Sequence, residues 1–259
     1  MSAKGWRWRV GIVLGVICLC QSAIAAEAGR ETQPVIHLVS SMDTRLSPLG
    51  RWLELVYREA FSRLGYRLDY QGYPGGRAPL LAERGEVDGE IHRAAEYLHQ
   101  TANLIRVPEP HFQVSYVAYA VKPGLAVQGW LGLGQLPGLR VEYRRGAKHA
   151  ETMLNEMIKP ESLDNIATTE QGLRKLVVGR SDIFVEQELV LEPMLARLRQ
   201  HSHEFDDVYR AGLLESVDTY AYLYKEHAAL ARQLADTLRA MKQEGLIERY
   251  RLQAIDMAQ

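Results

Sequence analysis

The fold is decided by residues 35–70, VIHLVSSMDTRLSPLGRWLELVYREAFSRLGYRLDY. Val35–Val39 is a short apolar run of the kind found in buried strands. Across residues 49–64, apolar side chains recur at helical spacing, and Gly65 stands where a left-handed C-terminal cap is expected. Tyr66–Tyr70 then has the composition of a second strand. A strand, a helix and a strand in this order predict a parallel sheet with a right-handed crossover.

The rest of the chain repeats this alternation. The segment Lys122-Pro123-Gly124 separates a first α/β unit from a second one, so two lobes are favoured for a chain of this length. The further predicted elements are a helix at 77–84, strands at 87–91, 113–121 and 139–143, helices at 147–157 and from 168 or 169 to 177, a strand at 183–185, a helix at 188–199, a strand at 219–224 and a helix at 228–241 that Gly245 closes. The fold class is therefore α/β throughout.

Residues 1–25 have the pattern of a cleavable secretory signal. Lys4, Arg7 and Arg9 precede the apolar run Val10–Cys20, and Ala23-Ile24-Ala25 places small residues at the two positions that a signal peptidase reads. We expect cleavage directly after this tripeptide and export to the periplasm. A retained membrane anchor is less favoured, because the apolar run is shorter than the roughly 20 residues that span a bilayer.

Removal of this signal changes what the chain can do chemically. The two cysteines, Cys18 and Cys20, lie inside the signal, so the mature chain has neither a disulfide nor a thiolate nucleophile. Without the three basic residues of the signal, 28 of the 31 basic residues remain against 32 acidic ones, a formal charge of −4. This balance argues against nucleic acid as a partner.

Three phrases resemble those of the amino-acid-type, or family 3, periplasmic solute-binding proteins. They are RGEVDGEI at 84–91, LRKLVVGRSDIFVEQ at 173–187 and the C-terminal DTYAYLYKEHAALARQLADTLRAMKQEGLIERY. The resemblance implies a type II periplasmic-binding-protein fold with a ligand cleft between two lobes. It places lobe one at 34–121 plus 215–259 and lobe two at 125–210, with crossing strands around Val121 and Leu213.

A narrower resemblance is to a stand-alone branch of this family whose ligands are mostly unassigned. Its pattern is found here at Pro74–Ala78, Asp88–Arg93 and Leu104–Pro110. Two departures from the amino-acid binders bear on the ligand. His99–Ala102 stands where those proteins have a ligand-clamping arginine, and Gln187 stands where they have the acidic residue that holds the ligand ammonium. An ordinary α-amino acid is therefore not the expected ligand.

Candidate ligand contacts follow from sheet-edge positions, where open α/β sheets place their ligands. Arg93 follows the third strand and Arg77 opens a helix after a glycine-rich turn, and a guanidinium suits a carboxylate because its planar fork makes bidentate hydrogen bonds. The alternative is that both are surface or ion-paired arginines. Lys148 ends the segment Arg145–Lys148, which lies between a strand and a helix, where related proteins hold an anion at a helix N-terminus. The predicted ligand-binding residues are Arg93, Arg77, Glu90, Tyr97, Asp43, Lys148 and Gln187, with Trp52, Tyr73 and Tyr116 more consistent with structural roles.

No catalytic residue, metal site or cofactor is predicted. The pair His201 and His203 with Glu204 lacks a third spaced ligand, and the motifs of nucleotide-binding loops, zinc proteases and serine hydrolases are absent from the sequence. The expected function is non-covalent binding of a small polar or anionic solute by a monomer, for an ABC permease or a membrane sensor. The alternative is an elimination enzyme resembling cyclohexadienyl dehydratase, in which Glu90, Glu186 or Glu188 would transfer the proton.

Overall fold

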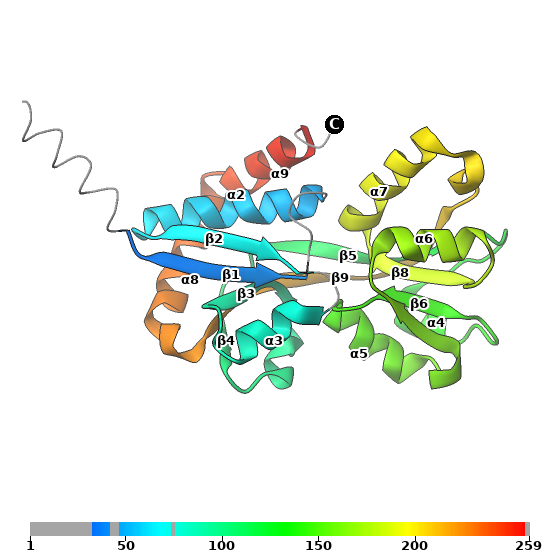
Figure 1. Ribbon diagram of the computed structural model, residues 1–259, viewed down its shortest axis with the longest axis horizontal. Helices are drawn as coiled ribbons and strands as arrows, with labels where there is room; N and C mark the ends of the chain where they lie inside the picture. The colour runs from blue at the N-terminus through cyan, green and yellow to red at the C-terminus, as the bar shows by residue number, and fades with distance from the viewer. Residues whose placement is uncertain (1–32, 42–46, 74–75, 257–259) are drawn as a thin grey trace, which may run out of the picture.

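The computed structural model describes residues 33–41, 47–73 and 76–256 of the chain. It has two lobes side by side, joined by two long strands (Figure 1). The signal predicted at residues 1–25 lies outside the described residues. Within the described part, no helix is both long and apolar enough to cross a membrane.

The first lobe contains the parallel strands that the sequence predicts. Its elements are β1 (Val35–Ser40), α2 (Pro48–Arg63), β2 (Arg67–Gly72), α3 (Arg77–Glu83), β3 (Gly89–Ala94), the 3₁₀-helix η2 (Ala95–Gln100), β4 (Leu104–Arg106), α8 (Ala228–Gln243) and α9 (Leu246–Asp256). β1 pairs in parallel with β2 on one side and with β3 on the other. This confirms the β-α-β unit at residues 35–70, and Gly65 follows α2 with a φ of 81°, the left-handed conformation of a C-terminal cap.

The core of this lobe lies under α2, which packs against α8 and α9. Leu53, Val56, Tyr57, Ala60 and Phe61 are fully buried, and their spacing of three and one residues places them on one face of the helix. Burial of each larger apolar side chain contributes about 1.5 to 3 kcal/mol. The apolar periodicity that predicted the helix therefore also marks the face that anchors it to the lobe.

The second lobe repeats the same design. Its elements are α4 (Gly129–Gly134), β6 (Val141–Arg144), α5 (Lys148–Met157), β7 (Leu163–Ile166), α6 (Thr169–Val177), β8 (Ile183–Gln187) and α7 (Glu188–His201). β6 pairs in parallel with both β7 and β8. The Thr168 hydroxyl accepts a hydrogen bond from the backbone N–H of Gln171, which is the N-terminal cap expected at this position.

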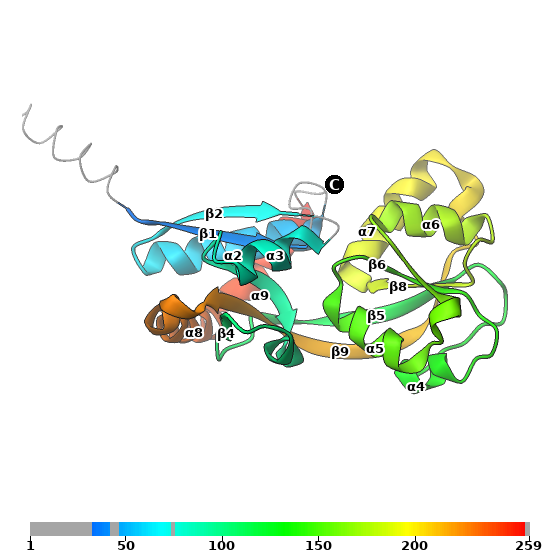
Figure 2. The same cartoon turned by 60° about the horizontal axis from the view of Figure 1, so that its bottom comes forward.

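Two antiparallel strands, β5 (Phe112–Ala120) and β9 (Tyr209–Tyr224), run from one lobe into the other (Figure 2). β9 pairs with β3 of the first lobe through Thr219–Leu223, whereas β5 pairs with β8 of the second lobe through Tyr116–Tyr119. The described strands thus form one nine-stranded sheet in the order β2-β1-β3-β9-β5-β8-β6-β7, with β4 on β9. The fold is the expected α/β type.

The elements that the sequence did not predict have local causes. β4 and β7 are three and four residues long, too short to show a period, and the six residues of α4 include three glycines, which are poor helix formers. β9 begins at Tyr209 rather than at residue 219. Its pairing with β5 skips Ala211 and Leu214, and these bulges interrupt the alternation that would have revealed the strand.

Candidate functional site

A small cavity of about 20 Å³ lies between the lobes, enough for one water molecule. It is lined by Ser41, His92, Arg93, Ala94, Glu96, Tyr97, Gln100, Tyr116, Arg144, Gly146, Ala147, Lys148, His149 and Gln187. Most of these residues come from the carboxyl ends of β1, β3, β6 and β8 and from the segments that follow them. This is the edge at which open α/β sheets bind ligands.

Arg93 is buried at the end of β3, and its guanidinium spans the two lobes. It donates to Glu90 Oε2 through Nε (2.9 Å) and Nη2 (2.6 Å), to the Ser41 hydroxyl (2.9 Å) and, across the cleft, to the carbonyl oxygen of Gly146 (2.9 Å). The ring of Tyr97 lies 5.1 Å from the guanidinium carbon. Burial lowers the pKa of Arg93, but the Glu90 carboxylate more than offsets this and leaves it raised.

Arg144, at the end of β6, approaches the same cavity from the second lobe, and the sequence did not single it out. Its Nε donates to Glu186 Oε2 (2.6 Å) and its Nη1 donates to the carbonyl oxygen of Ser41 in the first lobe (3.1 Å). The side chain is 5% exposed, and Nη2 has no hydrogen-bond partner among the described residues. A buried guanidinium nitrogen without an acceptor is costly.

The carboxylates considered for proton transfer are each paired with an arginine. Glu90 pairs with Arg93, Glu186 with Arg144, and Glu188 with Arg210 at 3.1 Å. Glu186 also accepts hydrogen bonds from the Thr169 hydroxyl (3.0 Å) and the backbone N–H of Gln187 (2.9 Å). These carboxylates hold the arginines in place.

A row of hydrogen-bonded side chains runs from the core of the first lobe to the cavity. The Tyr57 hydroxyl is 2.7 Å from His111 Nδ1, His111 Nε2 is 3.3 Å from His92 Nδ1, and His92 Nε2 is 2.8 Å from Gln187 Oε1. Gln187 Nε2 in turn donates to the Tyr116 hydroxyl (3.0 Å). His92 has a φ of 74°, in the left-handed region, at the bulge where the β3–β9 register shifts. This backbone conformation directs its ring toward the second lobe.

A second group of side chains bridges the lobes at His149, the second residue of α5. His149 Nδ1 faces the Glu96 carboxylate of η2, and His149 Nε2 lies 2.9 Å from Glu215 of β9, which also accepts from Trp130 Nε1 (2.7 Å). Burial lowers the pKa of His149, but the two carboxylates outweigh this and leave it raised. The imidazolium form donates from both nitrogens, so it is the form that this geometry favours.

We expect His149 to stabilise the protein at low pH and to lose this effect as the pH rises. Because its pKa is higher in the folded state, its contribution is fully present below the unfolded value of 6.5 and disappears as the pH passes the raised folded value. The difference in unfolding free energy between wild type and His149→Gln should be about 1 kcal/mol at pH 5.5 and smaller above neutrality. Chemical denaturation across this pH range measures it. His203→Gln is the surface control, because the His203 side chain is 97% exposed.

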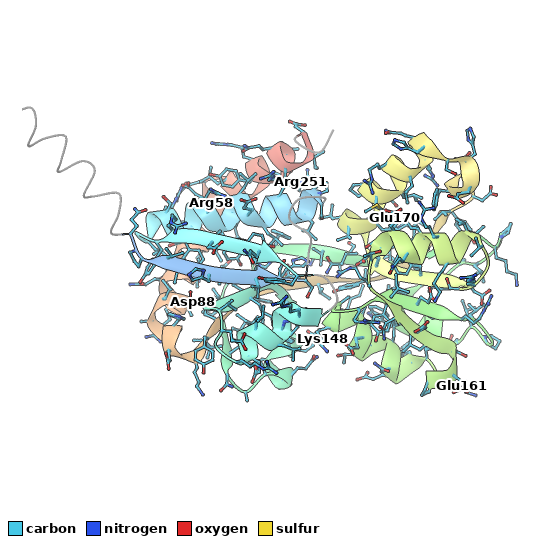
Figure 3. The ribbon with its side chains drawn as sticks, viewed as in Figure 1. Arg58, Asp88, Lys148, Glu161, Glu170 and Arg251 are labelled. Atoms are coloured by element: carbon cyan, nitrogen blue, oxygen red, sulfur yellow. The ribbon has the colours of Figure 1, made fainter. Side chains whose placement is uncertain are left out.

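The structure brings four of the predicted residues together at the cavity: Arg93, Tyr97, Lys148 and Gln187. Lys148 opens α5 beside the border between the lobes (Figure 3) and pairs with Glu151 at 2.9 Å. Glu90 lies behind Arg93 rather than in the lining. Arg77 is exposed and its guanidinium carbon lies 5.1 Å from the Tyr73 ring centre, outside the lining. Asp43 lies outside the described residues.

Of the residues given structural roles, Trp52 stacks on Phe112 with ring centres 3.5 Å apart, and Tyr116 contacts the cavity. His201, His203 and Glu204 bind separate partners, Arg197, Asp206 and Arg174. In the part of the chain that the structure describes, no group of three or more His, Cys, Asp or Glu side chains is arranged to hold a metal ion.

Sequence analysis did not single out four of the residues that line the cavity: Arg144, His92, His149 and Ser41. For Arg144 the available signal was its place at the end of a predicted strand, next to the turn that begins at Arg145. Consecutive strand residues face opposite sides. Arg144 is buried and faces the cavity, whereas Arg145 is exposed and donates to Asn165 (2.8 Å). The sequence predicted that this strand ends at residue 143, so the alternation of faces could not be extended to Arg144 and Arg145.

Comparison with known proteins gives one relative in sequence and many in fold. An uncharacterized protein of Shewanella oneidensis is 34% identical over 258 residues, which cover 96% of each chain. No established family profile matches the chain.

Among solved structures, a mutant of the arginine-binding protein ArgBP from T. maritima is 14% identical over 89% of this chain and 98% of its own, with a TM-score of 0.66. AbpA from Streptococcus pneumoniae, an amino acid ABC transporter substrate-binding protein bound to L-arginine, is 16% identical over 90% of this chain and 98% of its own. Its TM-score is also 0.66. A histidine kinase sensor domain with similarity to periplasmic binding proteins is 16% identical over 85% of this chain and 95% of its own, again with a TM-score of 0.66. The chain thus belongs to one family with the Shewanella oneidensis protein, and it has the type II fold of the amino-acid-type, or family 3, periplasmic solute-binding proteins.

Proposed function

We propose that this protein binds a small anionic solute between its lobes, with Arg93 and Arg144 as the principal contacts. The observation that carries the proposal is the buried Nη2 of Arg144, which has no acceptor among the described residues although Arg144 lines the interlobe cavity. An anionic oxygen would satisfy this nitrogen with a charge-assisted hydrogen bond, about twice as strong as a neutral one. Lys148 and the N-terminus of α5, at the same cavity, add positive potential.

Binding would be coupled to closure of the lobes. Arg93 of the first lobe donates to Gly146 of the second, and Arg144 of the second lobe donates to Ser41 of the first. An anion that contacts both guanidiniums therefore stabilises the closed arrangement over an open one, in which the two arginines are separated. We place the moving units at 34–121 plus 215–259 and at 125–210, joined by β5 and β9.

The compartment and the partner belong to the same proposal. The secretory signal predicted at residues 1–25 and the fold support a periplasmic protein, and the proposed acting unit is a monomer. One structural neighbour is named as an ABC transporter substrate-binding protein and another as a histidine kinase sensor domain. Delivery of the solute to an ABC permease, or its presentation to a membrane sensor, would each fit a binding protein of this fold.

The test is calorimetric titration of the mature protein with acetate, propionate, pyruvate, succinate, 2-oxoglutarate, phosphate and sulfate. We expect at least one of these anions to bind, and native mass spectrometry of protein purified without refolding to show a co-purified anion. If no anion binds and none is co-purified, the proposed function is wrong.

Arg93→Lys should weaken binding of whichever anion binds by about tenfold, because lysine keeps the charge but loses the planar fork. The melting temperature of the Arg93→Lys variant should change little, since the lysine ammonium can still pair with Glu90. The same titration measures the affinity. Arg106→Lys is the control, because Arg106 lies over the Tyr220 ring outside the cavity lining. Equal affinities of Arg93→Lys and wild type would remove Arg93 from the site.

A further inference from the structure

We propose that the buried row of side chains from Tyr57 to Tyr116 fixes the Tyr116 hydroxyl as a hydrogen-bond donor into the cavity. The ligand is then a carboxylate with an adjacent acceptor oxygen and no ammonium group, as in a 2-oxo acid. The inference about the ligand rests on the proposed function, since it assumes that the anion occupies the cavity beside Arg93 and Arg144. The direction of the hydrogen bonds is independent of it.

The direction follows from the donors and acceptors along the row. Gln187 donates from Nε2 to the Tyr116 hydroxyl, so its Oε1 accepts from His92 Nε2. A neutral imidazole that carries its proton on Nε2 accepts on Nδ1, so His111 donates to His92 from Nε2. His111 Nδ1 then accepts from the Tyr57 hydroxyl. The ring centres of the two histidines are 5.6 Å apart with planes inclined by 29°, so the rings are stacked as well as hydrogen-bonded.

The opposite direction is disfavoured by the burial of Tyr57. If every hydrogen bond were reversed, the Tyr57 hydroxyl would accept from His111 and its own proton would need another acceptor. Tyr57 is fully buried, and its hydroxyl has no second hydrogen-bond partner among the described residues. A buried hydroxyl proton without an acceptor is costly. In the direction given above, the unused proton belongs to Tyr116 instead, at the cavity, where a ligand can accept it.

Both histidines are in the neutral form that this scheme requires. Burial lowers the pKa of His92 to about 4, against the opposing effect of the Gln187 hydrogen bond and with smaller contributions from the charges of Arg93 and Arg144. Burial also holds the pKa of His111 well below its usual range, with smaller contributions from His92 and Lys242. Burial raises the pKa of Tyr116 to about 12, so its hydroxyl keeps its proton at neutral pH.

The donors at the cavity decide the class of ligand. Arg93, Arg144 and Tyr116 line the cavity, and their polar groups are N–H or O–H donors, so they match a ligand with two neighbouring acceptor oxygens. An α-ammonium group needs an acceptor. Among the described lining residues the only carboxylate is Glu96, and it is already bound to His149. Gln187 stands where amino-acid binders have the acidic residue that holds the ligand ammonium. Its Oε1 already accepts a hydrogen bond from His92.

The first experiment reads the histidine tautomers directly. Long-range ¹H–¹⁵N correlation spectra of the mature protein at pH 7 should show His92 and His111 as neutral Nε2–H tautomers, with both Nδ1 atoms as acceptors. Nδ1–H tautomers would reverse the row and overturn the proposal, whatever the protein binds. The ring signals that are absent from the spectrum of His111→Gln are those of His111, which assigns them in the wild-type spectrum.

The second experiment compares matched acids by calorimetry: pyruvate with L-alanine and propionate, and 2-oxoglutarate with L-glutamate and glutarate. We expect one 2-oxo acid to bind at least about tenfold more tightly than both of its partners, the equivalent of one neutral hydrogen bond. Equal or tighter binding of the amino acid would overturn the ligand class. If none of these six acids binds, the ligand class is also wrong. Binding of phosphate or sulfate would in that case still support the proposed function.

Two variants connect the preference to the hydroxyl. Tyr116→Phe should lose about tenfold in affinity for that 2-oxo acid and about threefold or less for the plain acid, which reduces a tenfold preference to about threefold or less. Tyr119→Phe is the matched control, because Tyr119 lies on the same strand and donates to Glu192 (3.0 Å) outside the cavity lining. An unchanged preference in Tyr116→Phe would show that its hydroxyl does not donate to the ligand.

Discussion

Replacing Arg144 by methionine should lower the melting temperature of the ligand-free protein by roughly 6 to 20 °C and abolish anion binding. Glu186 has a fully buried side chain, and the substitution leaves its carboxylate without the guanidinium that is 2.6 Å away. Loss of one partner of a buried ion pair costs about 3–5 kcal/mol, and a domain of this size loses about 2–4 °C for each kcal/mol. Thermal melting and calorimetric titration measure the two effects.

A second substitution separates stability from binding. Arg144→Met/Glu186→Gln removes the uncompensated charge, and the glutamine can still hydrogen-bond Thr169 and the backbone of Gln187. The double variant should recover most of the melting temperature and still fail to bind anions. Arg140→Met is the control, because its pair with Asp182 is exposed and contributes about 1 kcal/mol or less. Anion affinity equal to wild type in the double variant would contradict the assigned role of Arg144.

Gly146→Val should hold the lobes apart and weaken anion binding by about 5- to 150-fold. A Cβ atom at Gly146 would lie 3.1 Å from the backbone nitrogen of Gly76 and 3.3 Å from the Ser41 hydroxyl, both in the opposite lobe. Overpacking of a close contact costs about 1–3 kcal/mol, which corresponds to this loss of affinity. Small-angle scattering should give a larger radius of gyration than that of the wild type under the same conditions.

The control for this prediction must carry the same backbone strain. Gly146 has a φ of 89°, so any side chain there also strains the turn itself. Gly179, in the second lobe, has a φ of 67°, and a Cβ atom there would point into open space, so Gly179→Val strains the chain without touching the first lobe. It should lose stability but keep its affinity and dimensions. If both variants lose affinity equally, strain rather than interlobe contact is responsible.

Local sequence pattern was enough to predict most of the fold. The apolar spacing across residues 49–64 indicated α2 and the face it buries, and Gly65 and Gly245 marked helix ends through their backbone freedom. Because each strand of an α/β unit ends at the same edge of its sheet, the order of elements also indicated Arg93, whereas the family resemblance indicated Gln187, and both line the cavity. These features depend on neighbours within a few turns or strands of the chain, which sequence periodicity reports.

The tertiary structure alone decided which side chains meet. Arg144 pairs with Glu186, 42 residues away, and His92 meets His111 and Gln187 at separations of 19 and 95 residues. The period of a strand shows that a residue is buried but not what it is buried against. That choice depends on strand register, on the bulge at His92 and on the approach of Gly146 to Ser41 across the cleft. Each is set by the packing of the two lobes, so the buried arginines and the histidine row were visible only in the folded chain.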